Sequence, residues 1–155
     1  MGEALKKRIS QEKFESPAVE AMLNLLVASD YMARKADEAC AEFGITRAQF
    51  NVLRILKGVY PDGHPRCEII RRMLEAAPDV TRLVDRLEAQ GLVVRDRCKE
   101  DRRLSIARIS KEGIALLEKM EPRMKEMGDH FAQRVSLRDC RELSRICEGL
   151  YGEDG

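Results

Sequence analysis

The sequence has no surplus of charge of either sign, because 28 lysines and arginines stand against 27 aspartates and glutamates, a net charge of +1. Tryptophan is absent and aromatic residues make up only 5% of the 155 residues. A core must therefore be built from aliphatic side chains, a composition that favours helices. No apolar run approaches the roughly 20 residues that cross a bilayer, and the first fifteen residues hold no apolar signal core. We expect a cytoplasmic protein without a membrane partner.

The sequence also lacks the common motifs of catalysis and metal binding. It contains no G-x-S-x-G, no phosphate-binding glycine loop and no H-E-x-x-H. The two histidines are far apart, and the cysteines form no C-x-x-C pair. The five cysteines, which we interpret as free thiols, are Cys40, Cys67, Cys98, Cys140 and Cys147. We therefore expect no enzyme activity, no cofactor and no metal site.

Hydrophobic spacing and capping residues predict a mainly α-helical chain. Residues 1–16 are polar and of mixed charge, which we interpret as a mobile arm or a frayed helix start. Ser16 followed by Pro17 is typical of the beginning of a helix, and residues 60–65 have turn composition throughout. The predicted helices are 17–42, 46–57, 66–74, 78–90, 110–134 and 136–150. Pro122 should kink the helix at 110–134.

The predicted helix at 78–90 has one apolar and one polar face. Val80, Leu83, Val84 and Leu87 are spaced so that they share one side, and Gly91 suits a left-handed helix end. The opposite side carries Thr81, Arg82, Asp85, Arg86 and Ala89. The apolar side is expected to pack on the protein, while the polar side remains open.

A charged β-hairpin is predicted directly after this helix. Residues 92–96 and 103–109 have strand character, and residues 97–102 form the tip. Between Arg95 and Arg103 there are five basic residues and three acidic ones, so positive charge is concentrated here. An arginine at such a tip can enter a DNA minor groove. Cys98 lies between Arg97 and Lys99, which favour its thiolate; it is either a redox sensor or an incidental surface cysteine.

The order of short helix, turn, polar-faced helix and basic hairpin indicates a winged helix-turn-helix that binds double-stranded DNA. Arg82 and Arg86 could each reach a guanine edge or a phosphate, and Thr81 could donate to a phosphate. Each feature also has a simpler interpretation, since a charged helix face is often merely solvated and a charged hairpin tip often only protects a sheet edge. The candidate DNA-binding residues are Thr81, Arg82, Asp85, Arg86, Arg95, Arg97, Lys99, Asp101, Arg102 and Arg103.

Residues 80–113, VTRLVDRLEAQGLVVRDRCKEDRRLSIARISKEG, closely resemble the multiple-antibiotic-resistance regulator (MarR) family of bacterial transcription regulators. The most specific parts are VTRLVDRLEAQGLV, the Asp101-Arg102-Arg103 motif and the run from Ile109 to Gly113. The resemblance implies a winged helix-turn-helix domain on a helical dimerisation domain that is built from both chain ends. On that basis residues 1–42 are an arm and the first dimerisation helix, residues 43–110 the DNA-binding lobe, and residues 111–155 the C-terminal dimerisation helices.

The resemblance further implies a homodimer that binds a pseudo-palindromic operator, represses transcription and is released by a small aromatic effector. The Asp-x-Arg wing pattern of the family falls on Asp101 and Arg103, with Arg103 as the expected minor-groove contact. One departure is that Ala76, Ala77, Pro78 and Asp79 stand where the family often has serine or threonine. Asp79 either caps the helix or accepts from a cytosine amino group.

Two further sets of residues follow from helical spacing and from position along the chain. An apolar stripe on the last predicted helix indicates a dimer interface or, alternatively, packing on the preceding helix; it consists of Leu137, Cys140, Leu143, Cys147 and Leu150. The candidate effector residues, each of which could equally be an ordinary packing or turn residue, are Tyr31, Arg34, Phe43, Tyr60 and His64. The competing function is that of a helical protein-protein interaction adaptor without DNA binding.

Overall fold

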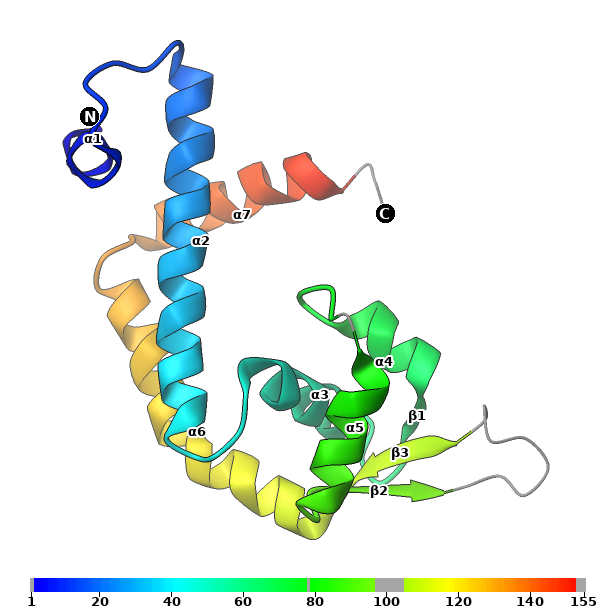
Figure 1. Ribbon diagram of the computed structural model, residues 1–155. Helices are drawn as coiled ribbons and strands as arrows, with labels where there is room; N and C mark the ends of the chain where they lie inside the picture. The colour runs from blue at the N-terminus through cyan, green and yellow to red at the C-terminus, as the bar shows by residue number, and fades with distance from the viewer. Residues whose placement is uncertain (1, 78, 97–104, 153–155) are drawn as a thin grey trace. The chain divides into compact units, whose positions relative to one another are not determined.

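The computed structural model describes residues 2–77, 79–96 and 105–152, which form a mainly helical chain with a small antiparallel sheet (Figure 1). This confirms the predicted fold class. The described residues fall into two compact units, Met1–Arg47 and Ala48–Gly155. The helices are α1 (Glu3–Ile9), α2 (Pro17–Ala41), α3 (Arg47–Lys57), α4 (Arg66–Arg72), α5 (Val80–Ala89), α6 (Lys111–Ala132) and α7 (Leu137–Tyr151), and the strands are β1 (His64–Pro65), β2 (Val93–Asp96) and β3 (Ile106–Ile109).

The first unit contains α1 and α2. The Ser16 hydroxyl accepts a hydrogen bond from the Val19 amide at 3.2 Å, which confirms the predicted beginning of α2. Residues 3–9 form a helix, so the mobile arm was the wrong alternative for this part of the chain. Leu5 of α1 is buried, and Arg8 lies 3.6 Å from Asp30 of α2. One apolar anchor and one ion pair therefore order a segment whose composition is otherwise polar. In the part of the chain that the structure describes, no helix combines the length and apolarity needed to cross a membrane.

The sheet of the second unit has the strand order β1-β3-β2. Strands β2 and β3 pair in antiparallel register, with Val93 opposite Ile109, which confirms the predicted hairpin. Strand β1 was missed, because a two-residue strand that contains a proline shows no alternation and lies within residues predicted as a turn. It pairs His64 with Ala107 of β3. The predicted tip at 97–102 and the first two residues of the returning strand lie outside the described residues.

Helix α5 is bounded by a capping aspartate at its start and a left-handed glycine after its end. The Asp79 carboxylate accepts from the Arg82 amide at 3.0 Å, so Asp79 is the N-cap of the helix. Val80, Val84 and Leu87 are buried, as their spacing predicts. Gly91 ends the helix with a φ of +73°, which confirms the left-handed position.

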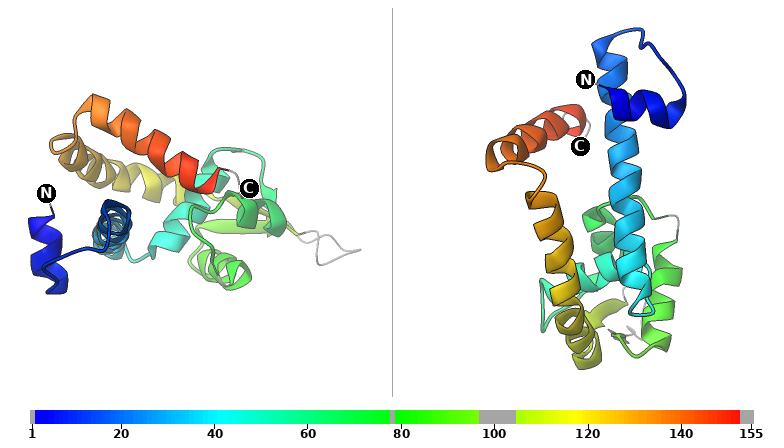
Figure 2. Two further views of the ribbon diagram at one scale, coloured as in Figure 1. Left: turned by 90° about the horizontal axis from the view of Figure 1, so that it is seen from above. Right: turned by 90° about the vertical axis from the view of Figure 1, so that its left-hand side faces the viewer.

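The two C-terminal helices also begin at the predicted caps. The Ser110 hydroxyl accepts from the Gly113 amide at 3.0 Å, and the Ser136 hydroxyl accepts from the Asp139 amide at 3.2 Å. Pro122 lies inside α6, and Figure 1 shows that this helix changes direction along its length, as expected for an internal proline. In Figure 1 and in the right view of Figure 2, α7 turns away from α6 and does not fold back along it.

The beginning of α6 is joined tightly to the end of α5 and the start of β2. The Ser110 hydroxyl donates to the Gly91 carbonyl at 2.7 Å, and the Ser110 amide donates to the Leu92 carbonyl at 3.0 Å. Gly113 lies so close to the Leu92 backbone that a Cβ placed on it would overlap the Leu92 carbonyl oxygen. This junction fixes where the hairpin leaves the helical body.

We expect Gly113→Ala to lower the free energy of unfolding by about 1–3 kcal/mol, because the added methyl group overpacks against the rigid Leu92 backbone. The matched control is Gly128→Ala in the same helix, where the added Cβ meets no described atom beyond the backbone of its own helix turn. This control should gain about 0.5–1 kcal/mol from helix propensity. Urea denaturation of both variants checks the prediction, and equal stabilisation of the two would contradict the close approach at Gly113.

Candidate nucleic-acid interface

Helix α5 of the second unit has one solvent-exposed polar face. Thr81, Arg82, Asp85 and Arg86 are all exposed, and the Arg82 side chain is 76% exposed. Their neighbours on the opposite face are buried in the core. The helix therefore has the division that a DNA-reading element needs, with one side held and one side open.

The two exposed arginines of α5 differ in their partners. The Arg82 Nε atom lies 3.6 Å from the Asp79 carboxylate, which is also the cap of the helix. Arg86 forms no ion pair with any residue that the structure describes. The Arg82 charge is thus offset in part at the helix start, whereas no acidic side chain of the described ranges offsets the Arg86 charge one turn later.

Arg95 of β2 is held by two carboxylates of α5. Its Nη2 atom lies 2.7 Å from Asp85, its Nε atom donates to Glu88 at 2.7 Å, and its side chain is only 18% exposed. Burial lowers the pKa of the guanidinium, but the hydrogen bonds and charges of Glu88 and Asp85 raise it further, so it lies above its ordinary value. Arg95 and Asp85 were both candidate DNA-binding residues, and the structure places them in this internal ion-pair cluster. Their charges therefore join the hairpin to α5.

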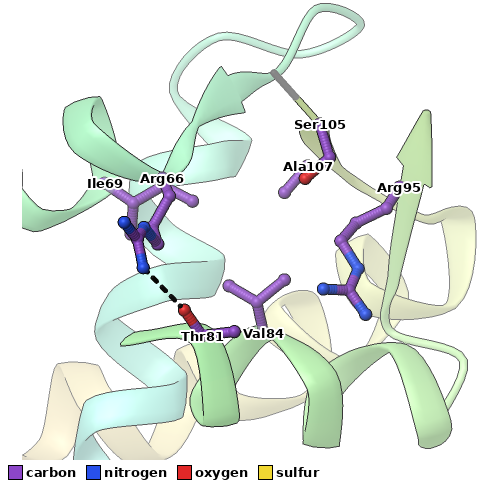
Figure 3. Close-up of a pocket in the computed structure, with 7 residues that line it drawn as sticks. All are labelled: Arg66, Ile69, Thr81, Val84, Arg95, Ser105 and Ala107. Atoms are coloured by element: carbon purple, nitrogen blue, oxygen red, sulfur yellow. Dashed lines mark hydrogen bonds between the residues drawn. The ribbon is translucent and has the colours of Figure 1, made fainter. Parts of the chain in front are cut away.

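A hollow of about 270 Å³ lies between the start of α4, the start of α5 and the sheet (Figure 3). Thr81 is on its rim, and Arg66, the first residue of α4, donates from Nη1 to the Thr81 hydroxyl at 3.2 Å. Arg66 was not among the residues predicted from the sequence. The only signal was its position after Pro65 at a predicted helix start, and nothing in the sequence places that start beside Thr81. The hollow is lined by Arg66, Ile69, Thr81, Val84, Arg95, Ser105 and Ala107.

Five of the candidate DNA-binding residues lie outside the described residues, four in the predicted tip and one at the start of the predicted returning strand: Arg97, Lys99, Asp101, Arg102 and Arg103. Cys98 lies there as well. Nearer the body, Arg108 of β3 pairs across the hairpin with Asp96 of β2 at 2.7 Å, and both side chains are about half exposed. This ion pair joins β2 and β3 at the end of the described part of the hairpin.

The candidate effector residues are divided between the two units. Tyr31 and Arg34 are exposed on α2, where Arg34 pairs with Asp30 at 3.1 Å, and Phe43 follows the end of that helix. Tyr60 and His64 belong to the second unit. Tyr60 is exposed, and the Nε2 atom of His64 is buried without a hydrogen-bond partner among the described residues. Neither unit by itself brings all five residues together.

The apolar stripe of α7 is uncovered in the single chain. Leu137 and Leu150 are 69% and 64% exposed, and no residue of this helix is buried. Cys140 and Cys147 are half-buried. Packing of the stripe against α6, the alternative left open by the sequence, is therefore not observed.

A short helix, a polar-faced second helix and an antiparallel hairpin beside it define the winged helix-turn-helix class. The model of the MarR family matches residues 43–104 of the chain. The solved MarR transcription factor from Planctomyces limnophilus is 33% identical, with a TM-score of 0.69, and the match covers 88% of this chain and 98% of that one. The chain therefore belongs to the MarR family.

Two other similarities agree with this membership. The HTH-type transcriptional regulator MhqR of Bacillus subtilis is 32% identical over 90 residues, which are 58% of this chain and 57% of that protein. The chain thus covers less than two thirds of MhqR. The S. aureus MepR structure, solved as a DNA complex, has the same fold with a TM-score of 0.73 at 23% identity, over 83% of this chain and 94% of that one. MhqR and the Planctomyces limnophilus protein are transcription regulators by name, so membership of this family confirms the expectation that the chain is not an enzyme.

We expect Arg95→Met to lower the free energy of unfolding by about 1–2 kcal/mol, because Asp85 and Glu88 lose their shared, largely buried partner. The matched control is Arg108→Met, which breaks an exposed ion pair of the same hairpin and should cost less than about 1 kcal/mol. Denaturant unfolding curves measure both. Equal losses would show that the Arg95 cluster contributes no more than a surface ion pair.

Proposed function

We propose that the protein is a homodimeric, sequence-specific regulator of bacterial transcription that acts in the cytoplasm as a repressor and is released by a small aromatic effector. The observation that carries the proposal is the division of α5 between a buried apolar face and an exposed face with Arg82 and Arg86. In a helix-turn-helix, this second helix lies in the major groove and its exposed residues contact the DNA.

In this proposal the helix and the hairpin have separate roles. Arg82 and Arg86 reach base edges or phosphates of the major groove, and Thr81 donates to a phosphate. Asp85 and Arg95 support the site through their ion pair. The minor groove is contacted from residues 97–103 of the predicted hairpin. Arg103 is the principal contact, Arg97, Lys99 and Arg102 support it, and Asp101 orients Arg103.

The exposed face of α7 supports the dimer. Five large side chains of α7 are exposed: Leu137, Leu143, Ile146, Leu150 and Tyr151. Contact of so much apolar surface with water is unfavourable, and a contiguous apolar patch of this kind marks a surface that a partner covers. We assign residues 1–42 and 111–155 to dimerisation and residues 43–110 to DNA binding. A twofold axis would place the two copies of α5 roughly 34–36 Å apart, one DNA turn, so the operator is pseudo-palindromic.

Release by an effector completes the proposal. Tyr31 and Arg34 in the second half of α2 and Phe43 just after it, together with Tyr60 and His64 before α4, supply aromatic and polar groups for a small aromatic molecule. A ligand lowers the affinity for DNA if it binds more tightly to the dimer in which the spacing of the two DNA-binding lobes does not fit the operator.

Binding to the promoter DNA next to the gene should weaken steeply with salt, because each neutralised phosphate contributes about 0.9 to the slope of log affinity against log salt concentration. Arg103→Ala should cost about 1–3 kcal/mol of binding energy. Fluorescence anisotropy with a labelled promoter fragment measures both, with Lys119→Ala on the exposed side of α6 as the control of unchanged affinity. If the wild type shows no measurable affinity at low salt, the adaptor function is supported instead.

Arg82→Ala and Arg86→Ala distinguish base contacts from phosphate contacts. Loss of a base contact reduces the preference for the operator over a scrambled duplex, by about 1–3 kcal/mol, whereas loss of a phosphate contact weakens both duplexes equally. Competition titrations with the two duplexes provide the measurement. If neither variant changes any affinity, the exposed face of α5 is not the DNA-reading surface.

Leu143→Glu and Leu150→Glu should convert the dimer to a monomer, because a carboxylate would be buried at the proposed interface. The matched control is Gly149→Glu, which adds the same charge at an exposed position on the side of α7 opposite the stripe, where an added Cβ meets no described neighbour. Sedimentation velocity at micromolar concentration reports the oligomeric state. A dimer that survives both leucine substitutions would remove α7 from the interface.

A further inference from the structure

We propose that Arg66 and Thr81 together bind one backbone phosphate of the operator, so that the first helix of the helix-turn-helix fixes the position of the second on the duplex. The inference rests on the proposed function and adds a contact that the sequence did not indicate. It comes from the side chains at the hollow between α4, α5 and the sheet.

The two side chains form one donor cluster. Arg66 is exposed at the start of α4, and its Nη1 atom donates to the Thr81 hydroxyl at 3.2 Å. Figure 3 shows Arg66 and Thr81 close together on one side of the hollow, with Arg95 on the other. A guanidinium has five N–H donors, of which this bond uses one. Because the Thr81 oxygen accepts from Arg66, its own hydrogen can be donated to the same phosphate.

The charge of Arg66 distinguishes it from its neighbours. Arg95 across the hollow is bound by Asp85 and Glu88, and Arg71 on the same helix lies 2.7 Å from Glu68. Within residues 2–77, 79–96 and 105–152, Arg66 has no acidic partner. Of the two arginines that line the hollow, Arg66 is therefore the one whose charge is not neutralised by a described carboxylate. A phosphate can neutralise it, since a planar guanidinium donates two parallel hydrogen bonds to a phosphate.

The place of Arg66 in the fold favours a phosphate over a base edge. In a helix-turn-helix complex the second helix enters the major groove while the first crosses the sugar-phosphate backbone. Arg66 is the first residue of that first helix, and its side chain contacts Thr81, the second residue of α5. Contacts of this kind set register and orientation but do not select sequence.

The experiment compares the full-length wild type with Arg66→Gln, Arg66→Lys and Thr81→Val, by fluorescence anisotropy on the promoter fragment and a scrambled duplex at several salt concentrations. Arg71→Gln is the matched control, because it removes the same formal charge from the same helix but from a residue already paired with Glu68. Thermal unfolding by circular dichroism verifies that each variant is folded.

Arg66→Gln should weaken binding to both duplexes by the same factor and lower the salt slope by about 0.9, so that between 50 and 200 mM salt it loses about 3.5-fold less affinity than the wild type. Arg66→Lys should keep the wild-type slope, because it keeps the charge. Thr81→Val should weaken both duplexes equally while its slope stays unchanged. Arg71→Gln should behave as the wild type.

The proposal is overturned if Arg66→Gln has the same slope as Arg71→Gln, or if it reduces the preference for the operator, which would make Arg66 a base contact. It is also overturned if Arg66→Lys lowers the slope as much as Arg66→Gln, since the effect would then be structural. In each of these cases the wild type still binds DNA with a steep salt dependence. Loss of that wild-type binding would instead refute the proposed function itself.

Discussion

The burial of one face of α5 is the constraint on which the rest of the site depends. Val80, Val84 and Leu87 leave water on the inner side of the helix, and each such side chain contributes roughly 1.5–3 kcal/mol. Because these residues recur at helical spacing, their burial fixes the rotation of the helix about its own axis. Arg82 and Arg86 are exposed as a consequence. The polar face is thus determined by its apolar counterpart.

A second constraint fixes the hairpin relative to this helix. Arg95 extends from β2 to Asp85 and Glu88, and Ser110 joins the end of β3 to the turn after α5. The close approach of Gly113 to the Leu92 carbonyl brings the start of α6 to the same junction. Helix, hairpin and the following long helix therefore meet in one small region. The cost of this arrangement is that Arg95 of the basic hairpin and Asp85 of α5 neutralise each other and contribute little free charge.

Much of the fold could be predicted because its signals are local. Ser16, Asp79, Ser110 and Ser136 each cap a helix that begins within one or two residues of the predicted start. The left-handed Gly91 and the antiparallel hairpin were likewise predicted from neighbouring residues. Strand β1 was missed because two residues carry no period. The sequence did not distinguish the helix at Glu3–Ile9 from an arm, because that helix is held by the burial of Leu5 and by an ion pair with Asp30, far along the chain.

The sequence alone determined which residues can form the DNA-binding face, because helical and strand periods assign each side chain to one side of its element. Only the tertiary structure decided which of those charges are free. Arg95 and Asp85 read as separate exposed groups in the sequence, yet the fold pairs them at 2.7 Å. Arg66 carries no motif, yet the fold places it 3.2 Å from the Thr81 hydroxyl. The physical reason is that an ion pair or a donor cluster depends on distances between different elements, and those distances are set by packing.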